Sequence, residues 1–75
     1  MIKVYSTDSC SWCMKVKQYL KLKNIDFEDV NVQRNLSAKR EMIAKTHQMG
    51  VPVIDINGTI IVGFDRTAID EALNL

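Results

Sequence analysis

The sequence predicts an α/β domain in which three helices flank a mixed four-stranded sheet. Two observations carry this prediction. The chain opens with a strand, a helix and a second strand, and such a unit requires a parallel strand pair joined by a right-handed crossover. Later, Asn57-Gly58 lies between two β-rich runs, which is a strong signal for a hairpin and hence for an antiparallel pair. Because the chain has 75 residues, we expect one domain spanning residues 1–75.

The first strand and the first helix are read from residues 2–5 and 10–23. Residues 2–5 form a short β-rich run, and residues 6–9 form a polar connection. In the following segment four side chains recur on one face of a helix: Cys13, Val16, Tyr19 and Leu20. Asn24 tolerates a left-handed backbone, so we expect the helix to end there.

The second strand and the second helix are read from residues 27–32 and from Asn35 to about Gln48. Residues 27–32 alternate apolar and polar side chains, as a strand does. Asn35 can cap a helix, and Gly50 is expected to stop it. The buried face of this helix is predicted to consist of Leu36, Met42, Ile43 and Thr46.

The last three elements are a hairpin and a short helix. Residues 51–56 form its first strand, with Pro52 at the start, where a missing N–H is tolerated. Residues 59–62 return as the partner strand, and Asp65 caps the final helix. Its inward side chains are predicted to be Ala68, Ile69, Ala72 and Leu73.

Composition and charge exclude several classes of function. The net charge is +1, with ten basic residues scattered among nine acidic ones, and phosphate binding needs a basic stripe instead. No apolar run approaches the ~20 residues of a membrane span, so we expect neither nucleic acid nor membrane as a partner. The N-terminus enters a strand pattern directly and lacks the regions of a signal peptide. We therefore expect a cytoplasmic protein, in a compartment that keeps thiols reduced.

Cys10 and Cys13, in the stretch CSWC, are the only cysteines of the chain. A permanent disulfide would be unusual in the cytosol, and so small a loop would add little stability. Cys10 lies where the helix begins, so its sulfur can accept from the amides of Trp12 and Cys13 at the positive end of the helix dipole. We predict that Cys10 has a depressed pKa and acts as the nucleophile, whereas Cys13 is shielded and resolves the mixed disulfide.

A metal site is the alternative reading of the two cysteines. A structural zinc site needs four ligands, and the only histidine, His47, lies late in the second helix. We therefore expect no metal held by one chain. Two chains could still share an iron–sulfur cluster, each supplying a cysteine, so an iron–sulfur carrier stays open as an alternative function.

Three stretches carry a family resemblance: VYSTDSCSWC, GVPVIDING and IIVGFDRTAID. Together they resemble glutaredoxin-like proteins of the thioredoxin-fold superfamily, both the dithiol glutaredoxins and the NrdH-type redoxins that supply electrons to ribonucleotide reductase. The resemblance implies a thioredoxin fold, with the sheet in the order second, first, third and fourth strand. It implies a cis peptide bond at Val51-Pro52 and a redox-active CxxC disulfide used in electron transport.

The resemblance also implies a substrate groove, with glutathione as co-substrate. Its walls would be Tyr5, Trp12, Val51, Pro52, Gly63, Phe64 and Asp65. Tyr5 ends a strand and reads equally well as a packing residue. A cis bond would turn the backbone of Val51 outward, where it could pair with a bound peptide in strand fashion. For Asp65 two readings stay open, a plain helix N-cap and a group that helps to hold the γ-glutamyl end of glutathione.

Three departures from the glutathione-dependent pattern leave the reductant open. Thr7 and Asp8 stand where a Lys or Arg is usual, Arg66 stands where a second acid is common, and Ser11 replaces the common proline. We expect a monomeric disulfide reductase acting on disulfide-containing proteins or glutathione mixed disulfides. Its reductant would be glutathione or, for a dedicated electron-donor redoxin, a thioredoxin reductase.

Overall fold

The computed structural model describes all residues from Met1 to Leu75, and the seven predicted elements are present in the predicted order. The longest helix has 12 residues, so no helix could cross a membrane. The elements are β1 (Ile2–Ser6), α1 (Ser11–Leu22), β2 (Glu28–Asn31), α2 (Leu36–Thr46), β3 (Val53–Ile56), β4 (Thr59–Val62) and α3 (Arg66–Leu73).

The four strands form one mixed sheet in the order β2-β1-β3-β4. β1 runs parallel to β2 and antiparallel to β3, and β3 and β4 form an antiparallel hairpin. Asn57 and Gly58 have φ angles of +52° and +99°, the left-handed conformations that a two-residue hairpin turn requires. The predicted thioredoxin fold and its strand order are thus confirmed.

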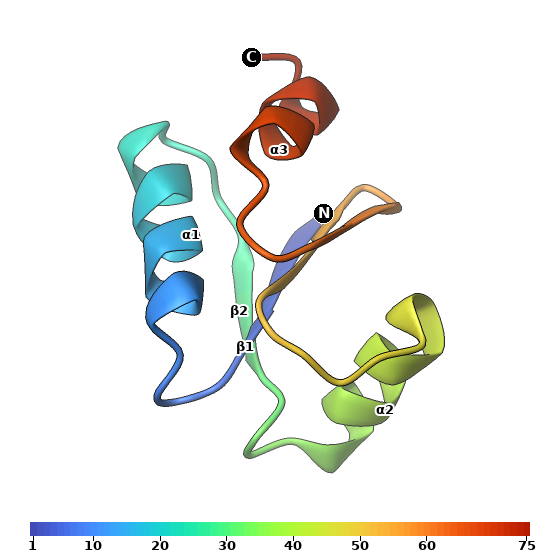
Figure 1. The fold of residues 1–75 in the computed structure, drawn as a ribbon. Helices are drawn as coiled ribbons and strands as arrows, with labels where there is room; N and C mark the ends of the chain where they lie inside the picture. Colours follow the sequence, from blue (N-terminus) through green and yellow to red (C-terminus); the bar gives the residue numbers. More distant parts are fainter.

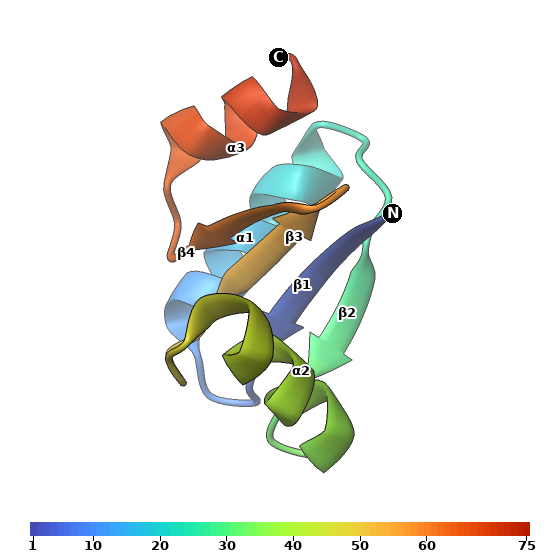
Figure 2. The same cartoon turned by 90° about the vertical axis from the view of Figure 1, so that its right-hand side faces the viewer.

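The helices cover both faces of the sheet. Figure 1 shows α1 and α2 on opposite sides of the strands and α3 above them, and Figure 2 shows α2 in front of the strands. α1 and α3 share one face, because Val16 and Ile69 belong to the same core cluster. Side chains alternate along β1, so Val4 points toward α1 and α3 while Tyr5 points toward α2. The first face buries Val4, Val16, Leu20, Ile54, Ile56, Ile61 and Ile69, and the second buries Tyr5, Val32, Ala38, Met42 and Val53.

Helix α2 differs from the prediction at both ends. Leu36 was expected on the buried face but is 61 % exposed, because it lies six residues from Met42 and therefore about 120° around the helix. Ala38, which was not predicted, is buried instead. The helix ends at Thr46, since His47 adopts a left-handed φ of +57° and caps it before Gly50 is reached.

Two strands are shorter than predicted. β2 lacks Phe27 and Val32, although both side chains still pack against the two cores. β3 begins at Val53, so Val51 and Pro52 lie outside the strand and are free to form part of a loop. The peptide bond between them is cis, as the family resemblance implied.

Candidate functional site

Cys10 is the N-cap residue of α1, with an extended backbone at φ −102°. Its sulfur accepts a hydrogen bond from the backbone N–H of Cys13, with 3.1 Å between Sγ and N. The predicted second bond from the N–H of Trp12 is absent. An N-cap side chain reaches the third helical residue most readily, and that residue is Cys13. The local sequence therefore places a sulfur at the positive end of a helix.

The two cysteines form a disulfide, and their Cα atoms are 5.2 Å apart, within the range that a disulfide spans. Their environments differ. Cys13 has no exposed surface and lies on the buried face of α1 with Val16 and Leu20. Cys10 is partly exposed. One sulfur can therefore be reached from outside, and the other lies behind it.

A cleft of about 280 Å³ lies beside the start of α1. It brings together three segments of the chain, because the N–H of Gly63 donates to the carbonyl of Pro52 over 2.8 Å and the Trp12 ring lies 6.3 Å from that of Phe64. Trp12 is 54 % exposed, so a large aromatic surface remains available there. The lining residues are five of the seven predicted for the groove: Trp12, Val51, Pro52, Gly63 and Phe64.

The backbone of Val51 is unpaired in this cleft. Neither its N–H nor its carbonyl takes part in a hydrogen bond within the chain, because β3 begins two residues later and the neighbouring bond from Gly63 ends at Pro52. A partly buried amide without a partner is uncommon in proteins. The cleft therefore offers one donor and one acceptor to an extended peptide.

Tyr5 does not line the cleft, which corrects the expectation for this residue. It pairs with Val53 in the sheet, and strand alternation directs its side chain to the α2 face, where it has no exposed surface. Its hydroxyl accepts a hydrogen bond of 2.9 Å from Nζ of Lys45, which also forms an ion pair of 2.7 Å with Asp55. Tyr5 is thus part of the core and of a polar network beneath the sheet.

That network shifts the pKa values of its charged members. Hydrogen bonds from Lys45 to Asp55 and to the Tyr5 hydroxyl raise the pKa of Lys45. Burial alone would raise the pKa of Asp55, but Lys45 and the N–H of Gly58 lower it below 3.8, its ordinary value. Both groups are therefore charged at neutral pH and hold α2 to β3.

Asp65 caps α3, with its Oδ1 accepting a 3.1 Å hydrogen bond from the N–H of Ala68. The N-cap reading is thus confirmed. Asp65 lies beside the cleft but is not among its lining residues, and its role toward glutathione stays a prediction. Phe64 packs between the rings of Trp12 and Tyr19, which places the α3 N-terminus next to α1.

Asp8 plays a part that the sequence did not reveal. Its carboxylate accepts from Nδ2 of Asn31 at 2.8 Å and from Nε of Arg34 at 3.1 Å, and its N–H donates to Oε1 of Gln33 at 3.1 Å. The hydrogen bonds from Asn31 and Arg34 lower the pKa of Asp8. This set, which we call the Asp8 clamp, ties the loop before Cys10 to the turn between β2 and α2.

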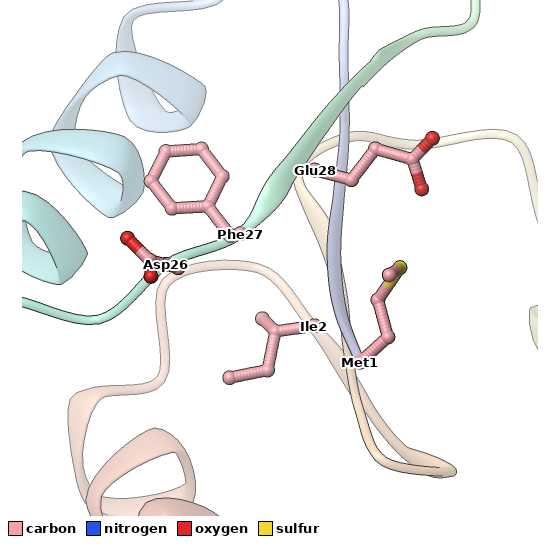
Figure 3. A pocket seen from close by; sticks show the side chains of 5 residues that line it. All are labelled: Met1, Ile2, Asp26, Phe27 and Glu28. Carbon is pink, nitrogen blue, oxygen red and sulfur yellow. The ribbon is translucent and has the colours of Figure 1, made fainter.

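The largest hollow of the molecule lies away from the cysteines. It measures about 410 Å³ and is formed at the start of β1 and at the segment leading into β2 (Figure 3). Cys10 follows the other end of β1, so the hollow is at the opposite end of the sheet. The hollow is lined by Met1, Ile2, Asp26, Phe27 and Glu28.

Nowhere in the molecule is a group of three or more His, Cys, Asp or Glu side chains placed to hold a metal ion.

Comparison with known proteins agrees with this geometry. A glutaredoxin-like 8.6 kDa protein in the rubredoxin operon of Clostridium pasteurianum is 55 % identical over 73 residues, which cover 97 % of each chain. The methanoredoxin of Methanosarcina acetivorans has a TM-score of 0.90 and 30 % identity, covering 99 % of this chain and 84 % of that one. The NrdH-redoxin of Escherichia coli has a TM-score of 0.81 and 26 % identity, covering 99 % and 92 %.

The family model for glutaredoxin matches residues 2–61. The match includes both cysteines, the cis peptide bond and three of the four strands in full. A partly exposed sulfur at a helix N-terminus, paired with a buried one, suits thiol–disulfide exchange, because the exposed sulfur can be reached and is favoured as a thiolate. The chain therefore belongs to the glutaredoxin family, and its Cys10–Cys13 pair is a thiol–disulfide redox centre.

Proposed function

We propose that this protein is a disulfide reductase that works through both cysteines. The Cys10 thiolate attacks one sulfur of a substrate disulfide, forms a mixed disulfide and releases the first substrate thiolate. Cys13 then loses its proton, attacks the sulfur of Cys10 and releases the second substrate thiolate. Two electrons pass to the substrate, and the protein is left with the Cys10–Cys13 disulfide, as in the structure.

The N-cap position of Cys10 is the observation that carries this proposal. The N–H of Cys13 already donates to its sulfur, and the helix dipole favours a negative charge at the same place. Both effects stabilise a thiolate, which is the reactive form. Cys13 lacks exposure, so an outside disulfide meets Cys10 first.

The cleft supports a peptide as the substrate. The free N–H and carbonyl of Val51 suit an extended chain on either side of the attacked sulfur, and Trp12 and Phe64 offer apolar walls. Glutathione is a small peptide of this kind. We propose that its γ-glutamyl end lies toward the N-terminus of α3, where backbone N–H groups favour the carboxylate and the Asp65 side chain can hold the ammonium group. The reaction belongs in a reducing compartment such as the cytosol, with residues 1–75 acting as a monomeric domain.

A matched pair of variants tests the proposed roles. After mixing with glutathione disulfide, Cys13→Ser should hold glutathione on Cys10 as a stable adduct that mass spectrometry detects. Cys10→Ser keeps only the buried thiol and should form little adduct. Equal labelling of the two variants, or a Cys10→Ser variant as active as the parent, would refute the assignment.

A second candidate is a dedicated electron donor that a thioredoxin reductase reduces. Asp8 favours it, because the loop has a carboxylate where glutathione-dependent relatives usually have a cation, and the cation that reaches this loop, Arg34, is bound to that carboxylate. The related NrdH-redoxin of Escherichia coli is described as a glutaredoxin-like protein with a thioredoxin-like activity profile.

A coupled assay of NADPH oxidation separates the two candidates. One reaction contains glutathione and glutathione reductase, and the other contains thioredoxin reductase, with the same protein disulfide as substrate. Turnover with glutathione supports the first candidate, and turnover only with thioredoxin reductase supports the second. Absence of turnover in both reactions would contradict a reductase function altogether.

A further inference from the structure

We propose that Arg34 is a positioning residue for Cys10, which it serves by neutralising the carboxylate of Asp8 and holding the loop before the cysteine. The inference rests on the proposed role of Cys10 as an attacking thiolate. Arg34 lies 24 residues after Cys10 in the sequence, yet the Asp8 clamp brings it to the loop that leads into α1.

Both the carboxylate and the backbone N–H of Asp8 form hydrogen bonds in the clamp. The carboxylate of Asp8 holds Asn31 and Arg34, and the carbonyl oxygen of the Asn31 side chain accepts from the N–H groups of Gln33 and Arg34 at 2.9 and 3.2 Å. The backbone N–H of Asp8 is bound in turn by Gln33. The turn after β2 is thereby folded around Asp8, and the guanidinium of Arg34 is held against the carboxylate.

Asp8 lies close to Cys10 along the chain, in the loop that leads into α1. Only Ser9 lies between them, so their Cα atoms are at most about 7 Å apart. A bare carboxylate in this loop opposes a thiolate on Cys10, which is the species that exchange needs. With Arg34 in place the pair is close to neutral, and the helix dipole acts on the sulfur without this opposition.

The other charged groups near Cys10 are engaged with partners of their own. On α1, Lys15 lies over the Trp12 ring and Lys17 pairs with Asp29 of β2 at 2.9 Å. At the start of α3, Asp65 caps the helix and Arg66 lies over the Tyr19 ring. The Asp8 clamp is thus the charge pair nearest to Cys10 in the sequence, and Arg34 is its cationic member.

Three variants measure this effect in a Cys13→Ser background, where Cys10 titrates alone. The readout is the pH dependence of alkylation by iodoacetamide, a neutral probe that Arg34 cannot attract by charge. Arg34→Gln should raise the pKa of Cys10 by roughly half a pH unit, which is about threefold less thiolate at a given pH below it. Asp8→Asn should lower the pKa by a similar amount, and the double variant should return it close to the parent value. Arg34→Lys is the conservative control and should keep most of the parent behaviour.

The pattern distinguishes the electrostatic role from a merely structural one. A loop that is only loosened would shift the pKa in the same direction in both single variants and would not recover in the double variant. That result, or no shift in Arg34→Gln, would overturn the inference. The parent itself tests the proposed function separately, since a Cys10 that ionises like free cysteine contradicts an activated thiolate whatever the variants do.

Discussion

Replacing Lys45 by Met should destabilise the protein more than any other change to a charged residue on α2. Lys45 joins three groups beneath the sheet, with Nζ lying 2.9 Å from the Tyr5 hydroxyl, 2.7 Å from Asp55 and 3.2 Å from Glu41. Its side chain is 28 % exposed and that of Asp55 only 13 %. The variant keeps the apolar stem but leaves the Asp55 carboxylate partly buried without its cation.

The expected loss lies between two limits. Breaking a fully buried ion pair costs about 3–5 kcal/mol, and an exposed pair contributes up to about 1 kcal/mol. Because the Lys45–Asp55 pair is mostly but not fully buried, we expect Lys45→Met to lower the free energy of unfolding by about 2 kcal/mol at pH 7. Glu41 keeps Lys3 as a partner at 3.3 Å and should add little to the loss.

The loss should depend on pH. In the parent, the lowered pKa of Asp55 provides stability that is present above pH 3.8, its ordinary pKa, and that is lost as the pH falls through the folded-state pKa. Without Lys45, burial raises the pKa of Asp55, so the unpaired carboxylate destabilises the variant at neutral pH and is relieved by protonation in acid. The difference between parent and variant should therefore shrink as the pH falls from 7 toward 3.

Urea unfolding at a series of pH values, followed by circular dichroism, measures this difference. Lys39→Met on the same helix is the matched control, because Lys39 forms no ion pair, and it should stay within about 0.5 kcal/mol of the parent. The double variant Lys45→Met/Asp55→Asn should recover part of the lost free energy of unfolding, because it removes the unpaired carboxylate. A loss below about 0.5 kcal/mol at pH 7, which is close to the error of the method, or a loss independent of pH, would refute the reasoning.

Three further outcomes are expected. Trp12→Ala removes an aromatic cleft wall, so the KM for a glutathione mixed disulfide should rise by about tenfold while the rate of alkylation of Cys10 stays unchanged; a higher alkylation rate would show that Trp12 shields the sulfur instead. Asp65→Ala loses the α3 N-cap and should cost about 1 kcal/mol in thermal unfolding, whereas Asp65→Asn keeps the cap and should weaken only glutathione binding. Met42→Ala opens a fully buried site and should cost about 2–5 kcal/mol, against little for the exposed Ala44→Ser.

The sequence alone determined the elements and several of their ends, because these depend on residues within a few positions of one another. Each helix begins at an N-cap side chain that accepts a hydrogen bond from the backbone N–H three residues later: Cys10, Asn35 and Asp65. The Asn57-Gly58 turn depends on its own two φ angles. The roles expected of the cysteine pair follow from the same local geometry. The strand order and the cis peptide bond came from the family resemblance rather than from local pattern, and the structure agrees with both.

The tertiary structure decided what depends on contacts between distant segments. Tyr5 reads equally well as a cleft wall or a core residue until the pairing of β1 with β3 directs it toward α2. Arg34 is 26 residues from Asp8, and no local sequence pattern around either residue predicts that they form an ion pair. Electrostatic attraction acts through space and not along the chain, so a charge pair in the loop before Cys10 can be recognised only when the fold has brought its two members together.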